Sequence, residues 1–154
     1  MRLLKRWMVS LFLMGCFTTS EASLIIPIYL PLDSGTGKNV GFVEADDTIY
    51  GLLLTPHLRE LPPGVHGFHI HQLPSCANKG LAAGSHLRAH PFDQHLGPYQ
   101  AGHLGDLPVL IVASDGRATL PVLAPRLKIS YLMDHALLKG RVRTVFGVAG
   151  ARIR

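Results

Sequence analysis

Histidine is concentrated in one part of this chain. Seven of its nine histidines lie between residues 66 and 103 of a sequence of 154 residues, and Asp106 follows the last of these seven by three positions. Neutral imidazole is the commonest protein ligand for transition metals, and carboxylate joins it readily at zinc. The residue types and their clustering therefore indicate a metal-binding protein.

The run GVHGFHIHQ predicts a strand that carries the first pair of ligands. Successive side chains of a strand point to opposite faces, so Phe68 and Ile70 share the core face while His69 and His71 share the other. Two imidazoles on a rigid strand can hold one ion; a pair of solvated histidines is the alternative. His66 has the parity of Phe68, which predicts a neutral, buried histidine bonded to backbone.

A second group is spread along residues 72–107, a stretch rich in Gly, Pro, His and Ala. Loops of that length are uncommon in compact domains unless something such as a bound metal ties them down. Three imidazoles and one carboxylate fit a closed tetrahedral zinc site. The predicted ligands are His86, His95, His103 and Asp106. Histidines scattered along a loop without a metal are the alternative.

The elements that must position these ligands read as short strands separated by turns, with no convincing helical period. The predicted strands are residues 24–32, 40–45, 48–54, 65–72, 107–112 and 118–123. Turns are predicted at residues 35–37, 46–47 and 114–116, and the last of these joins its two strands as a hairpin. Pro27 and Pro31 place the first strand at a sheet edge. The fold class is therefore all-β, an antiparallel sandwich or barrel.

Residues 1–22 are expected to be a signal peptide, with residues 23–154 as one domain. The segment has basic residues near its start, an apolar core too short to span a bilayer, and small residues at positions 20 and 22. One alternative is an uncleaved anchor. Another is a lipoprotein signal that ends before Cys16, because Leu-Met-Gly-Cys resembles a bacterial lipoprotein box; Cys16 would then carry the lipid anchor.

Charge and cysteine content narrow the range of partners. The formal net charge is +5, and removing three basic residues and one acidic residue with the signal lowers it to +3. Mild basicity attracts a small anion, but the chain has no Lys/Arg cluster, so no nucleic-acid partner is predicted. Cys76 is left without a partner in the mature chain, which is unusual in an oxidising compartment.

Several motifs together resemble the copper/zinc superoxide dismutases in their bacterial periplasmic form. They are GVHGFHIHQ, Ser75-Cys76, AAGSH, HLGP and GHLGDLP, and the resemblance runs from about residue 24 to 127 and returns at residues 150–152. It implies a Greek-key β-barrel of immunoglobulin-like architecture with a long metal-bound loop. It also implies copper and zinc as cofactors, superoxide as substrate, a periplasmic location and, as one option, a homodimer.

The resemblance assigns a role to each matching residue. His69, His71 and His86 match copper ligands; His86, His95, His103 and Asp106 match zinc ligands; Arg152 matches the arginine that guides the anion; and Cys76 matches half of the family's disulfide. In the implied chemistry one superoxide reduces Cu(II) and leaves as oxygen, and a second reoxidises Cu(I) and leaves as peroxide. His86, shared by both metals, would carry a proton between these half-reactions.

The C-terminal region departs from the family pattern and is shorter. Gly140 stands where the fourth copper histidine is expected, and His135 is five residues away, on the other face of a strand. No carboxylate occurs in residues 141–146, and no second cysteine follows Gly150. Three hypotheses follow: a superoxide dismutase that holds copper weakly, a zinc- and copper-binding periplasmic protein without turnover, or a decayed remnant of the enzyme.

Overall fold

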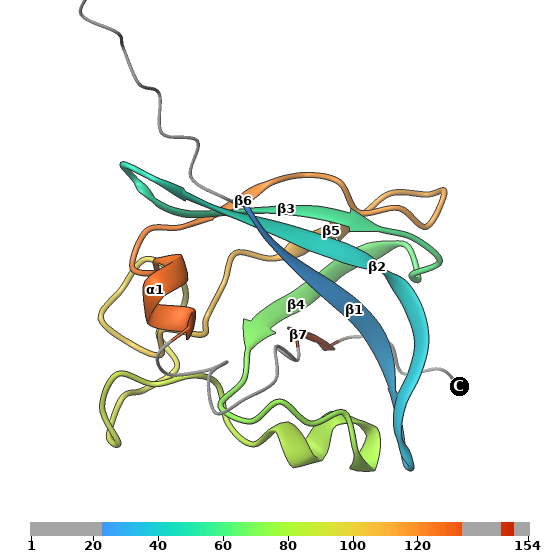
Figure 1. The fold of residues 1–154 in the computed structure, drawn as a ribbon, viewed down its shortest axis with the longest axis horizontal. Helices are drawn as coiled ribbons and strands as arrows, with labels where there is room; N and C mark the ends of the chain where they lie inside the picture. The colour runs from blue at the N-terminus through green and yellow to red at the C-terminus, as the bar shows by residue number, and fades with distance from the viewer. Residues whose placement is uncertain (1–22, 134–145, 150–154) are drawn as a thin grey trace, which may run out of the picture.

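The computed structural model describes residues 23–133 and 146–149. Its strands form a sandwich of two sheets, one ordered β1-β2-β3-β6 and the other β5-β4-β7. The elements are β1 (Leu24–Leu32), β2 (Gly35–Thr48), β3 (Gly51–Leu58), β4 (Gly64–Ile70), η1 (Asn78–Ala83), β5 (Leu110–Val112), β6 (Val122–Ala124), α1 (Ile129–Leu132) and β7 (Phe146–Ala149). In Figure 1 the long loop leaves the end of β4 and runs back beside α1.

The predicted all-β sandwich is confirmed. The chain leaves the first sheet after β3, forms β4 and β5 in the second, and returns as β6 beside β3. This crossing between sheets is a Greek-key type of connection. β1 lies at the edge of its sheet and pairs only with β2 among the described strands, as its prolines predict.

The core lies between the two sheets. Phe68 and Ile70 of β4 have no exposed surface, as the alternation along this strand predicts. They pack in one cluster with apolar side chains from the first sheet, chiefly Ile26, Val43, Ala45, Leu52 and Leu54. Because the residues of β4 alternate, burial of this apolar face turns the side chain of His69 away from the core.

The prediction that the runs before and after residues 114–116 pair with each other as a hairpin is wrong. The reversal itself is present: the N–H of Ala113 donates to the carbonyl of Arg117 at 2.8 Å. The two flanking runs then separate, because β5 pairs with β4 while β6 pairs with β3 in the other sheet. An Asp-Gly turn fixes a change of direction, whereas the choice of partner strand depends on which sheet can bury each apolar run.

Two other predicted turns lie a few residues from the observed ones. The β2–β3 reversal falls at Ile49 and Tyr50, where Thr48 Oγ1 accepts from the N–H of Tyr50 at 3.1 Å, rather than at residues 46–47. Asp47 instead remains in β2, where its carboxylate accepts from the N–H of Ile129 at 3.0 Å. The first reversal falls at residues 33–34, because β2 already begins at Gly35.

The remaining predictions concern the long loop and the ends of the chain. Between β4 and β5 the loop forms only the short 3₁₀ helix η1, as its composition predicts. Within residues 23–133 and 146–149, no helix has the length and apolar character needed to cross a membrane. The predicted signal peptide with Cys16, and the positions His135, Gly140 and Arg152, lie outside the described residues.

Candidate metal centre

Three backbone hydrogen bonds bring the ligand-bearing segments together. Ile70 at the end of β4 donates its N–H to the carbonyl of Gly105 at 2.9 Å, Leu87 donates to Ile70 at 2.8 Å, and Gly105 donates to Leu87 at 2.9 Å. Each of these three residues is next to a predicted ligand. The closed ring of bonds therefore fixes the strand and two parts of the loop around one point.

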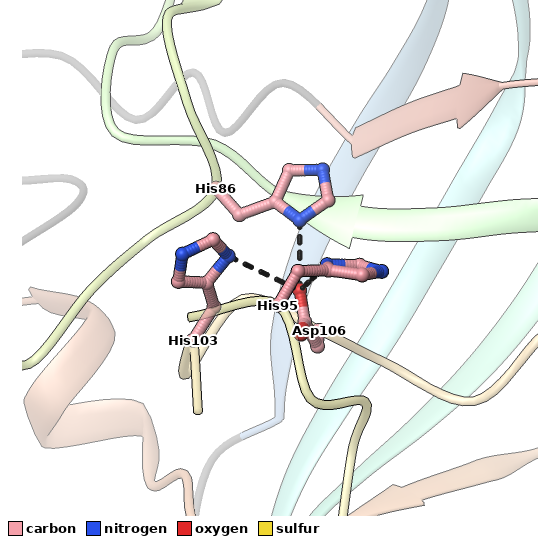
Figure 2. A group of neighbouring side chains, drawn as sticks. All are labelled: His86, His95, His103 and Asp106. Atoms are coloured by element: carbon pink, nitrogen blue, oxygen red, sulfur yellow. Dashed lines mark hydrogen bonds and ion pairs between the residues drawn. The ribbon is translucent and has the colours of Figure 1, made fainter. Parts of the chain in front are cut away.

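The second predicted group converges on a single oxygen atom. The Nδ1 atoms of His86, His95 and His103 lie 2.7, 2.8 and 3.6 Å from Oδ1 of Asp106. The Asp106 side chain is only 1% exposed, while that of His95 is 59% exposed. Figure 2 shows the three rings directed at this carboxylate from different parts of the loop. The four residues thus form a cluster around a buried carboxylate, and His95 is its most exposed member.

The spacing of these atoms suits a zinc ion. One donor atom from each of the four residues lies within 4.8 Å of all the others. A tetrahedral zinc ion with bonds of ~2.0–2.1 Å holds its ligand atoms about 3.3 Å apart. Small shifts of the side chains would therefore place all four donors in the coordination shell.

Hydrogen bonds outside the cluster set the orientation of His103. Its Nε2 lies 2.9 Å from the carbonyl oxygen of Asp93, which can only accept, so Nε2 carries the proton in the neutral ring. Nδ1 is then left as a buried lone pair without a hydrogen-bond partner. This free nitrogen, which faces the Asp106 carboxylate, is available to bind a metal ion. Metal-binding histidines usually donate the N–H of their other ring nitrogen to a carbonyl or carboxylate, as Nε2 does here.

His86 also faces His69 of β4 and His71, which directly follows the end of this strand. Its ring stacks on that of His69, with centroids 4.0 Å apart, and meets the ring of His71 edge-on at 5.2 Å. Nδ1 of His71 donates its N–H to the carbonyl of Gly84 at 2.9 Å, which leaves the lone pair of Nε2 available to bind a metal ion. Nδ1 of His69 is buried and has no hydrogen-bond partner. The structure therefore brings His69, His71 and His86 together beside the zinc-type cluster.

The family model of the copper/zinc superoxide dismutases (SODC) matches residues 38–145 of this chain. The chain belongs to this family. Among curated relatives, a superoxide dismutase [Cu-Zn] 1 of Salmonella typhimurium is 47% identical over an alignment of 137 residues, and the match covers 82% of this chain and 77% of the relative. The Escherichia coli superoxide dismutase [Cu-Zn] is 40% identical over 145 residues, covering 88% and 84%.

Solved structures of the family share the fold. The Cu/Zn superoxide dismutase from Brucella abortus aligns with a TM-score of 0.68 at 32% identity, over 82% of this chain and 95% of that chain. The monomeric copper, zinc superoxide dismutase from Salmonella enterica aligns with a TM-score of 0.65 at 46% identity, over 74% and 79%. The described His/Asp cluster thus occurs in a family that uses copper and zinc.

In this dismutase-family site, burial and hydrogen bonding shift the pKa values of three ligands toward the protonation states that bind metal. Burial lowers the pKa of His69 to about 4, and the adjacent His86 adds to this shift. Burial also lowers the pKa of His86, although Asp106 opposes the change. Burial by itself would raise the pKa of Asp106, but hydrogen bonds from His86 and the Gly97 N–H bring it below its usual value. The first two rings are therefore neutral and the carboxylate is charged at neutral pH, the forms that bind metal.

Two further residues with predicted roles lie near this centre in sequence. His66 is 5% exposed, and its Nε2 lies 2.7 Å from the carbonyl of Pro62, the backbone contact that its parity predicts. Cys76 is a free thiol within residues 23–133. Neither joins the His/Asp cluster. Gly140 and Arg152, like His135, lie outside the described residues.

Two residues that help to build the site were not found from the sequence. Gly105 belongs to the backbone ring, and Arg126 contacts three carbonyl groups of the loop that carries His103. Gly105 gave a weak signal, because a glycine between two predicted ligands suggests close approach of backbone. Arg126 gave none, because its partners lie 23–26 residues earlier in the chain.

Proposed function

We propose that this chain binds zinc through His86, His95, His103 and Asp106, binds copper through His69, His71 and His86, and disproportionates superoxide to oxygen and hydrogen peroxide. The observation that supports this most is the position of His86. Its Nδ1 faces Asp106, while its ring contacts His69 of β4 and His71 just after that strand. One imidazole is therefore placed to serve two adjoining metal ions.

The chain's own residues would divide the work. Bound copper would supply the one-electron chemistry, accepting an electron from one superoxide and returning it to another. Nδ1 of His86 lies 2.7 Å from Asp106 and would bind zinc, so the exchangeable proton of this ring would be held or released at Nε2. The formal charge of +3 that remains after removal of the signal, from +5 for the whole chain, favours the approach of an anion, with Arg152 as the proposed local guide.

A specific observation supports a second candidate, a zinc-binding protein with little or no turnover. Gly140 occupies the position at which the family pattern supplies the fourth copper histidine. A ligand contributes roughly a quarter of the ~10–16 kcal/mol that structural metal sites provide. Copper held by three nitrogens would then dissociate more readily than copper held by four.

Gly140→His is expected to separate these two functions. Added copper should bind the variant about 100-fold more tightly than the parent chain, and the dismutation rate at limiting copper should rise tenfold or more. Metal content by mass spectrometry and superoxide loss by stopped flow measure both effects. The rate should fall with added salt, because the substrate is an anion. Zinc binding without a gain in rate would favour the zinc-binding protein.

The first 22 residues lead us to propose export to the periplasm. The mature chain is expected in the periplasmic extract, beginning at Ser23 and retaining one cysteine, Cys76. Intact-mass measurement tests this, because lipidation would instead give a membrane-bound chain that begins at Cys16 with added acyl mass. Sedimentation of the same preparation would separate a monomer from the homodimer. A full-length chain recovered in the cytosol would contradict export.

A further inference from the structure

Arg126 lies between β6 and α1 and reaches across to the loop that carries His103. Nη2 donates to the carbonyl of Gly102 at 2.5 Å, and Nη1 donates to the carbonyls of Gln100 and of His103, the latter at 3.4 Å. All three acceptors belong to one four-residue stretch of the loop. The rigid fork of a guanidinium can hold several acceptors in fixed relative positions, which a flexible ammonium group cannot do.

The backbone that carries Arg126 is firmly attached to the first sheet. The next side chain, Leu127, is 1% exposed, and its N–H donates to the carbonyl of Ala124 at 3.1 Å. The N–H of Ile129 donates to Asp47 in β2 at 3.0 Å. The backbone on both sides of the arginine is thus fixed, so the hydrogen bonds of its side chain restrict the movement of residues 100–103.

The opposite side of the loop stretch is also fixed. His103 donates its N–H to the carbonyl of Gln94 at 2.9 Å. Gly102 is packed so closely that an added Cβ would lie 2.4 Å from that same carbonyl oxygen. The stretch is therefore held between Gln94 on one side and Arg126 on the other, which fixes the backbone from which the His103 ring projects.

We propose that Arg126 is a positioning residue for the zinc site, which holds residues 100–103 so that Nδ1 of His103 faces Asp106 before the metal binds. The inference depends on the zinc site of the proposed function. Ordering this stretch in advance removes an entropy cost that zinc binding would otherwise carry. Partners that orient a metal ligand from outside the coordination shell typically change metal affinity by ~10–100-fold.

Arg126→Met tests the proposal, because methionine keeps much of the side-chain bulk and removes every donor. Zinc affinity, measured by competition with a chelator, should fall about 10–100-fold. Arg126→Lys should recover part of this loss, because one ammonium can serve some of the three carbonyls. Arg117→Met is the control: Arg117 is exposed and, among the described residues, its side chain pairs with Asp115 at 3.6 Å and not with the His/Asp cluster, so affinity should stay at the parent value.

Cobalt(II) absorption and urea unfolding of the metal-free chain accompany the affinity measurement. A changed Co(II) d–d spectrum in Arg126→Met is expected, because the geometry of one ligand has been relaxed. Unchanged zinc affinity with lower metal-free stability would overturn the proposal and leave Arg126 with a structural role only. Should the methionine variant not fold, zinc affinity and metal-free stability are compared in Arg126→Lys instead, and unchanged affinity with lower stability would again overturn the proposal. A parent chain that binds no zinc would overturn the zinc site itself.

Discussion

Asp106→Asn is expected to lower zinc affinity by about two orders of magnitude or more. The carboxylate is the point on which three imidazole nitrogens converge, and its side chain is 1% exposed. An amide keeps the shape but removes the charge, so the variant loses roughly one ligand's share of the ~10–16 kcal/mol of a structural zinc site. Chelator competition at pH 7.5 measures the loss.

The same variant should also weaken copper binding at the neighbouring group. Asp106 accepts a hydrogen bond from Nδ1 of His86, and without this charged acceptor the orientation of the shared ring is less strictly fixed. Asp33→Asn is the control, because the exposed Asp33 carboxylate pairs with Lys79, and neither residue belongs to the His/Asp cluster. Zinc bound as tightly by a folded Asp106→Asn protein as by the parent would exclude Asp106 as a ligand.

Gly105→Ala is expected to disrupt both candidate metal sites at once. An added Cβ would lie 2.1 Å from the carbonyl oxygen of Ile70 and 2.7 Å from the nitrogen of Leu87. Both contacts are backbone atoms of the hydrogen-bonded ring, so the segments carrying the ligands must separate. We expect a loss of about 3 kcal/mol or more in unfolding free energy, measured by urea titration of the metal-free protein.

Zinc and copper affinity should fall together in Gly105→Ala, because the ring holds the strand and both parts of the loop. Gly35→Ala provides the comparison: Gly35 has a φ of +127° and nothing within 4 Å of an added Cβ, so this variant strains the backbone at the β1–β2 turn, outside the hydrogen-bonded ring. It should lose stability and keep its metal affinity. Parent-like metal affinity in Gly105→Ala would show that the ring does not hold the site together.

The amino-acid sequence by itself determined the local features of the site. Strand alternation has a period of two, so the burial of Phe68 and Ile70 was sufficient to place His69 on the other face. Pro27 and Pro31 marked an edge strand because a proline has no N–H to donate to a neighbour. The motifs around the ligands identified the family. Each of these conclusions depends on residues close together in the chain.

Only the tertiary structure decided how distant segments meet. Asp46 and Asp47 read as a turn, yet Asp47 stays in a strand because it accepts from Ile129, 82 positions later. The two runs around Asp115-Gly116 read as a hairpin, yet each pairs in a different sheet. Arg126 gives no local signal at all. Such contacts depend on which buried polar groups can satisfy one another in the folded chain, and no short-range pattern records that.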